Sequence, residues 1–274
     1  MSKGLGISSV ITNNLRAPTH FLCLPLCNPR SRAKLQTLVE TLRSDEASIG
    51  IPRAAFRLPN SFHLQLCNLR IETLDELHAA SDLLRSLDIS EILGRDSSDL
   101  QAACSGPVKS NPSNTRRQVK IPPVKVTLEG IEAYPRVDKA VSVCSSFQHG
   151  LDRFIMLACS FSQMFASISV AGQPFQPRFT AEKILGPNLL RTRYAKKWDT
   201  RVDTVGRARR IQSAAPLDIR GLFEKYKDTV WAEDLQIEKL SLCKEGRVKT
   251  FGGPNNSILV DEEYEEVASI ALPQ

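Results

Sequence analysis

The chain contains 274 residues, 42% of them hydrophobic, and carries a formal net charge of +6. This length and composition support a packed core, which excludes an intrinsically disordered protein. The positive charge favours anionic partners such as nucleic acid, nucleotides or acidic lipid head groups, without choosing among them.

Residues 1–15 are predicted to form a flexible N-terminal tail, and residues 16–274 a single domain. Residues 1–12 carry one lysine and no sustained apolar core, so we expect neither a signal peptide nor an Arg-rich transit peptide. Residues 19–26 form a short apolar run typical of a strand, and residues 33–42 show leucine and valine at helical spacing. The domain therefore opens with a strand, a turn and a helix.

A second strand and helix follow. Residues 61–69 alternate between two faces, one formed by Phe62, Leu64 and Leu66 and the other by His63, Gln65 and Cys67. Residues 73–87 predict a helix in which Thr73 is the N-cap and Glu76 completes a capping box.

Residues 97–123 are rich in Ser, Pro, Asn and basic residues and predict a flexible connection. The second half is predicted to contain strands at 124–134 and 140–144, an apolar helix from Leu151, a strand at 188–194, a helix at 216–228, and closing strands near 235–243 and 264–272. Because both halves contain strands and helices in alternation, we predict an α+β domain of two pseudo-symmetric lobes around a central cleft.

The cysteines and the most apolar segment favour an intracellular protein. The seven cysteines are odd in number, scattered and mostly in apolar stretches, which is typical of buried free thiols in a reducing compartment. Cys23 and Cys27 make no zinc site alone, because a tetrahedral site needs four ligands and no second pair follows at finger spacing. Residues 154–170 fall short of the ~20 residues that span a bilayer, so we expect no membrane association and a location in the nucleus or cytoplasm.

Four segments carry a resemblance to a known family. They are residues 16–26 (RAPTHFLCLPL), residues 61–69 (SFHLQLCNL) with the helix after them, and the C-terminal stretches 218–226 and 235–244. These segments resemble the two-histidine (2H) phosphoesterase superfamily, with antiparallel sheets and flanking helices. Within this superfamily they resemble the A-kinase-anchor-protein-like phosphoesterase domain, a branch that includes the 2'-5' RNA ligase-like proteins and the first subunit of the activating signal cointegrator complex.

In this superfamily two His-x-Thr/Ser motifs face each other across a cleft. One histidine acts as base and the other as acid, the hydroxyls bind phosphate oxygens, and no metal or cofactor is implied. The resemblance places the first motif on residues 63–65 (His-Leu-Gln), where an amide that can still donate a hydrogen bond replaces the hydroxyl. It places the second on residues 186–188 (Gly-Pro-Asn), so that Gly186 occupies the histidine position.

The missing histidine implies a degenerate phosphoesterase, because one acid/base residue is worth ~10²–10⁴ in rate. His63 is the candidate catalytic residue. The candidate ligand-binding residues are Gln65, Asn188, Thr192, Arg193 and Tyr194. Gln65 shares the strand face of His63, and Asn188, Thr192 and Tyr194 share another. The ligand implied by the resemblance is RNA, a nucleotide or another phosphate, with partner proteins where the chain is a subunit of a transcription-coactivator or RNA/DNA-repair complex.

Charged and aromatic side chains of the second half have two interpretations each. The basic tract from Arg191 to Arg210 could steer RNA toward the cleft or form a solvated loop. Aromatic residues in this region, Phe175, Phe179, Tyr194 and Trp198, could stack on bases or belong to the core. The acidic run at 261–266 is interpreted as a solvated turn without chemistry.

Other interpretations stay open. A working metal-independent phosphodiesterase could cleave 2',3'-cyclic or 2'-5' bonds with His63 and an unrecognised partner. A protein–protein adaptor could keep the fold with a vestigial cleft. A misassigned exon boundary within residues 145–190 could account for the departure from the family pattern there. Without that pattern, a structural histidine on a strand surface would be the simpler interpretation of His63.

Overall fold

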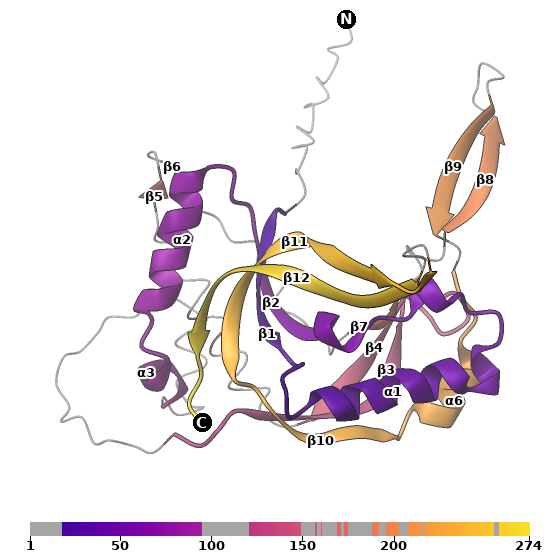
Figure 1. Cartoon of the computed structure of the whole chain (residues 1–274), viewed down its shortest axis with the longest axis horizontal. Coiled ribbons are helices and arrows are strands. Elements are labelled where there is room, and N and C mark those ends of the chain that lie inside the picture. The colour runs from indigo at the N-terminus through magenta and orange to yellow at the C-terminus, as the bar shows by residue number, and fades with distance from the viewer. Residues whose placement is uncertain are drawn as a thin grey trace, which may run out of the picture.

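The computed structural model describes residues 18–94, 121–148, 188–191, 196–202, 208–214, 216–254 and 258–274, with isolated positions at 157, 160, 169–170 and 173–174. Two four-stranded antiparallel sheets dominate this part of the chain, and helices pack beside them (Figure 1). The predicted α+β fold with antiparallel sheets is thus confirmed. The tail at 1–15, most of the connection at 97–123 and most of the helix predicted from Leu151 lie outside the described residues.

Sheet A has the order β12-β11-β1-β2, and sheet B has the order β10-β3-β4-β7. The strands of sheet A are β1 (His20–Pro25), β2 (His63–Leu69), β11 (Lys239–Gly252) and β12 (Ile258–Ala271). Those of sheet B are β3 (Lys125–Tyr134), β4 (Ser142–Gln148), β7 (Asn188–Arg191) and β10 (Val230–Gln236). Two short ribbons pair β5 (Ser169–Val170) with β6 (Gln173–Pro174) and β8 (Lys196–Val202) with β9 (Ala208–Ala214).

The described helices are α1 (Arg32–Ser44), α2 (Leu74–Ser86), α3 (Ile89–Leu93) and α6 (Arg220–Tyr226), with 3₁₀ turns η1 (Glu46–Ser48), η2 (Arg53–Ala55) and η3 (Pro59–Ser61). The predicted capping box of α2 is confirmed, because Thr73 Oγ1 accepts from the Glu76 amide and Glu76 Oε2 accepts from the Thr73 amide, both at 3.1 Å. Among the described helices, none combines the length and apolar character needed to cross a membrane.

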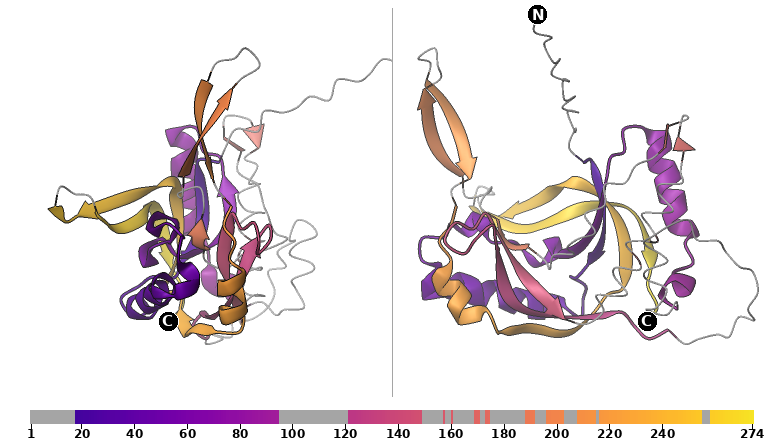
Figure 2. Two further views of the ribbon diagram at one scale, coloured as in Figure 1. Left: turned by 90° about the vertical axis from the view of Figure 1, so that its right-hand side faces the viewer. Right: turned by 180° about the vertical axis from the view of Figure 1, so that it is seen from behind.

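One hydrophobic cluster unites the two sheets. Its buried side chains come from sheet A, such as Leu22 and Leu64, and from sheet B, such as Val126 and Leu128. The leucine and valine face of α1 is also buried, which explains the helical spacing seen in the sequence. Figure 2 shows the β11–β12 hairpin projecting from this body.

The segment before β2 ties the edges of the two sheets together. The Arg57 amide donates to the Leu189 carbonyl at 2.9 Å, and Phe56 forms an isolated antiparallel bridge with Leu190. Strands β2 and β7 are edge strands of their sheets. His63 on β2 and Asn188 on β7 therefore lie near the place where the two sheets meet.

A register shift corrects the predicted faces of β2. Cys23 pairs with Gln65, whereas its neighbour Leu22 pairs with Cys67, so Leu66 is the extra residue of a bulge. Cys67 is therefore buried in the hydrophobic cluster, and the prediction that it shares the face of His63 was wrong. The side chain of Asn68 takes that place and accepts from Gln65 Nε2 at 2.5 Å.

Several predicted boundaries are also corrected. The helix predicted from residue 216 starts at Arg220, because Leu217 instead exchanges two backbone hydrogen bonds with Ala140. Because Ala140 takes part in this bridge, β4 starts at Ser142 and not at residue 140 as predicted. The acidic run at 261–266 is not a turn but the middle of β12, and Glu262 within it is buried. The basic tract contains the β8–β9 ribbon, for which the structure describes the backbone.

Candidate functional site

A cavity of about 320 Å³ lies on the His63 face of sheet A. Strands β1, β2, β11 and β12 contribute Cys23, His63, Cys243 and Tyr264 to its lining. At one end, Arg32 and Asn60 complete the wall. We call this space the His63 cavity.

The imidazole of His63 is held in one tautomer. Its Nδ1 lies 2.9 Å from the carbonyl oxygen of Ser61, and a carbonyl oxygen only accepts, so Nδ1 carries the hydrogen. Nε2 therefore bears a lone pair, and it has no hydrogen-bond partner among the described residues. The ring thus exposes an acceptor or base at the cavity wall.

His63 is neutral at physiological pH. Burial lowers the pKa of its imidazole to about 4, and the hydrogen bond to Ser61 only partly opposes that effect. The positive charges of Arg57, Arg191 and Arg247 lower the pKa further. A neutral imidazole can take a proton from a hydroxyl group, but it has no proton on Nε2 to give to a leaving oxygen.

Two aromatic rings hold the plane of the imidazole. The Phe21 ring centre lies 5.1 Å from that of His63, and the Tyr264 ring stands edge-on to it at 4.9 Å. Phe21 and Tyr264 also pack against each other at 4.8 Å. Because β1, β2 and β12 each supply one ring, the packing of sheet A fixes the orientation of His63.

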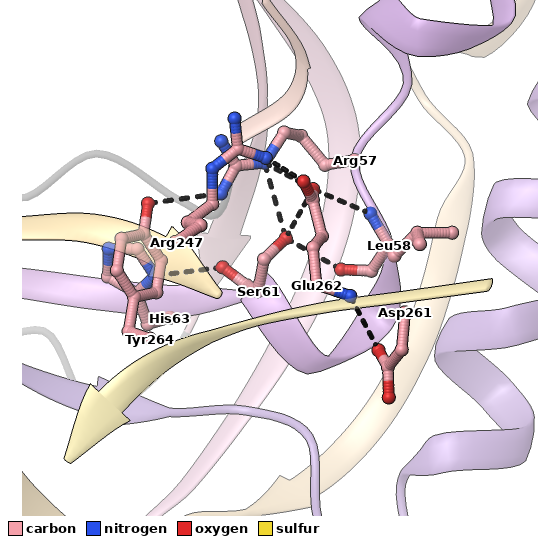
Figure 3. A network of polar contacts seen from close by, with 8 residues as sticks. All are labelled: Arg57, Leu58, Ser61, His63, Arg247, Asp261, Glu262 and Tyr264. Atoms are coloured by element: carbon pink, nitrogen blue, oxygen red, sulfur yellow. Dashed lines mark hydrogen bonds and ion pairs between the residues drawn. The ribbon is translucent and has the colours of Figure 1, made fainter. Parts of the chain in front are cut away.

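Behind the rings lies a buried ionic network (Figure 3). The Glu262 carboxylate forms ion pairs with Arg57, at 3.2 Å, and with Arg247. Arg57 also donates through Nε to Ser61 Oγ at 3.2 Å and through Nη2 to the Tyr264 hydroxyl at 3.1 Å. The network therefore connects Ser61, whose carbonyl oxygen orients His63, with Tyr264, whose ring packs against the imidazole.

Of the five predicted ligand-binding residues, the structure describes only Gln65 and Asn188. Gln65 is on the face of His63, but its amide bonds to Asn68 and it does not line the cavity. Asn188 is the first residue of β7, where the structure describes the backbone alone. The other three, Thr192, Arg193 and Tyr194, lie outside the described residues, as does Gly186.

Among the described histidines, His63 alone lines the cavity. His20 is buried at the start of β1, with Nδ1 2.9 Å from Thr19 Oγ1, and burial lowers the pKa of its imidazole. His78 is exposed on α2. The fourth histidine, His149, lies outside the described residues.

Four residues of the site were not identified from the sequence, namely Arg57, Arg247, Glu262 and Tyr264. Glu262 was assigned to a solvated turn, although Glu262, Tyr264 and Glu266 recur at the two-residue period of a strand. This two-residue period was the signal in the sequence that these residues belong to a strand, β12. No comparable signal exists for the Arg57–Glu262 pair, whose members are far apart in sequence and meet only when β12 packs beside η3.

Residues 18–143 match the family model described as "AKAP7 2'5' RNA ligase-like domain". This match confirms the predicted resemblance to the 2H phosphoesterase superfamily over the part of the chain that contains His63. The resemblance to the cointegrator subunit stays a prediction. No curated protein gives a significant match.

Solved structures with a similar overall path include phosphoesterases. One is titled "Crystal structure of phosphoesterase", with 15% identity, a TM-score of 0.42, and coverage of 94% of this chain and 100% of the other. E. coli LigT complexed with 3'-AMP has 13% identity, a TM-score of 0.40, and coverage of 94% and 99%. The protein TT0787 of Thermus thermophilus has 13% identity, a TM-score of 0.44, and coverage of 93% and 98%.

Proposed function

Because residues 18–143 match a family of the 2H phosphoesterase superfamily, we propose that this protein binds a phosphate-bearing ribonucleotide, such as an RNA terminus, in the His63 cavity. The observation that carries the proposal is the neutral imidazole of His63, with Nδ1 bonded to Ser61 and Nε2 facing no protein partner among the described residues. In the proposed complex, Nε2 accepts a hydrogen bond from a ribose hydroxyl or takes up a proton beside the phosphate.

The wall of the His63 cavity carries two basic side chains, Arg32 and Lys239, beside two carboxylates, Glu263 and Glu266. Arg32 donates to Asn60 Oδ1 at 2.9 Å and is otherwise exposed. Lys239 pairs with Glu266 at 2.6 Å, so a phosphate must compete with this carboxylate for its ammonium group. We expect binding of moderate strength, in which Arg32 supplies the steering charge.

The proposal includes weak catalysis or none. Hydrolysis of a phosphodiester needs a base for the attacking oxygen and an acid for the leaving oxygen. His63 can serve as the base, but the family pattern places Gly186 where the acid should be. Loss of one member of the pair lowers the rate by ~10²–10⁴.

A binding experiment tests the proposal. The ligand 3'-AMP is titrated calorimetrically into the wild type, His63→Ala and the matched control His78→Ala, which removes an exposed histidine of α2. We expect the wild type and His78→Ala to bind alike, and His63→Ala to bind about tenfold more weakly, because it loses one hydrogen bond. If no variant binds 3'-AMP or 2',3'-cyclic AMP, the cleft is vestigial and the adaptor interpretation replaces this one.

A further inference from the structure

A second cavity, of about 570 Å³, lies between α1 and β12. We call it the α1–β12 groove. Helix α1 contributes Arg32 and Arg43 to its lining, and β12 contributes Val260 and Asp261. Leu58 and Pro59 add an apolar wall between them.

Arg43 has no polar partner among the described residues. Its Nε is buried without a hydrogen-bond acceptor, and no described carboxylate forms an ion pair with its guanidinium group. The guanidinium carbon lies 5.8 Å from the centre of the Phe56 ring, which holds the side chain in place. Because Arg43 lines the groove and no described carboxylate pairs with it, an anion bound there would supply the negative partner that its guanidinium group lacks.

The charges of the groove favour a phosphate. Arg32 and Arg43 are both cationic; the positive charge of Arg53 and, more weakly, the negative charges of Glu262 and Glu40 also act on Arg43. Asp261 is the one acidic residue of the lining, and both its oxygens already accept, from Asn60 Nδ2 at 2.6 Å and from the Glu262 amide at 2.8 Å. A planar guanidinium matches two phosphate oxygens, and the apolar wall suits a base or a sugar.

The groove adjoins the His63 cavity, because Arg32 and Asn60 line both. We infer that the α1–β12 groove is a phosphate subsite for the second nucleotide of an RNA chain whose terminal nucleotide occupies the His63 cavity. This inference rests on the proposed function and deepens it, since the ligand becomes an oligonucleotide instead of a mononucleotide. Arg43 is the residue that binds the second phosphate.

A comparison of two ligands tests the subsite. Affinities for 3'-AMP and for the dinucleotide ApAp, which adds one internal phosphate, are measured for the wild type, Arg43→Gln, Arg43→Lys and the control Arg85→Gln. Arg85 is an exposed arginine of α2, so its replacement changes the net charge equally. We expect Arg43→Gln to weaken ApAp binding about tenfold and to leave 3'-AMP binding unchanged. Arg43→Lys should lose less of the affinity for ApAp, and Arg85→Gln should lose none of it.

Salt dependence gives an independent measure. Each phosphate neutralised on a single strand contributes a slope of about 0.7 to the dependence of log affinity on log salt, so Arg43→Gln should reduce the ApAp slope by about that amount. Asp261→Asn removes the one carboxylate of the groove and should strengthen ApAp binding. The subsite inference is overturned if Arg43→Gln weakens the binding of 3'-AMP and ApAp equally, or weakens the binding of neither.

A spectroscopic measurement separates failure of the subsite from failure of the proposed function. The ¹⁵Nε resonance of Arg43 is followed while ApAp is added to the wild type, and while inorganic phosphate is added to His63→Ala. A shift in both titrations supports the subsite, even if 3'-AMP fails to bind at His63. No shift with ApAp, in a protein that binds 3'-AMP, refutes the subsite and leaves the proposed function intact.

Discussion

The Nδ1 atom of His63 lies 2.9 Å from the carbonyl oxygen of Ser61, two residues earlier in the chain. Ser61 is itself fixed, because its hydroxyl donates to the Leu58 carbonyl at 2.7 Å and accepts from the buried Arg57 at 3.2 Å. The backbone and the ionic network together therefore set the tautomer of the imidazole.

The titration of His63 should be displaced to acid pH. Since burial lowers the pKa of the imidazole to about 4, its NMR resonances should move mainly below pH 5, and His63→Gln assigns them by their disappearance. A bound phosphodiester favours the imidazolium and should raise the pKa. Affinity should therefore increase as the pH falls from neutrality toward the value of the free protein. A free imidazole that titrates near 6.5 would contradict the described burial.

Glu262→Gln should destabilise the fold strongly. Glu262 and Arg57 are each only 2% exposed, and removing one partner of a buried pair leaves an uncompensated charge, at a cost of about 3–5 kcal/mol. Asp82→Asn is the matched control, because Asp82 pairs with Arg85 on the surface and is 77% exposed. It should cost less than about 1 kcal/mol. Urea denaturation measures both, and similar midpoints for the two variants would refute the network's role.

Asp45 should contribute to stability in a window at acid pH. Hydrogen bonds from Lys225 and Tyr226 of α6 lower the pKa of its carboxyl group to about 2. Because this folded-state value lies below that of the unfolded chain, the contribution is present above about pH 4 and is lost as the pH falls through about 2. Asp45→Asn should flatten the acid limb of the stability curve there. If the pH dependence of the free energy of unfolding is unchanged, the hydrogen bonds from α6 to Asp45, which follows α1, do not stabilise the fold.

Thr73→Ala should lower the free energy of unfolding by about 1 kcal/mol, because it removes the N-cap acceptor of α2. Thr73→Ser keeps a hydroxyl at the same position and should retain most of the stability. Thermal denaturation of the two variants makes the comparison. A loss of the same size in both would indicate packing of the threonine methyl group instead of capping.

Local patterns predicted much of the fold. The alternation around His63 and the Thr73–Glu76 capping box depend on neighbouring residues, so β2 and α2 could be read from the sequence. The bulge that sends Cys67 into the core could not, because it arises where β2 pairs with β1. The helix predicted at 216–228 was shortened for a similar reason, since Leu217 pairs with Ala140 across the fold.

His63 was proposed as a site residue from a family resemblance, and in the structure it lines a cavity on sheet A. Glu262 was missed because a run of carboxylates is typical of a solvated surface, and only the long-range approach of Arg57 and Arg247 makes its burial favourable. Gln65, whose role in ligand binding stays a prediction, bonds to Asn68 beside the bulge, a contact that no local pattern signals.

The proposed site pairs His63 with no acid, and hydrolysis of 2',3'-cyclic AMP tests this most directly. Single-turnover rates are measured for the wild type, His63→Ala and His78→Ala across neutral pH. We expect equal rates for the three proteins, at or near the uncatalysed rate, even when the wild type is saturated with ligand. A bell-shaped pH profile in the wild type, with a rate that falls at least ~100-fold in His63→Ala alone, would contradict this claim and establish an active phosphodiesterase.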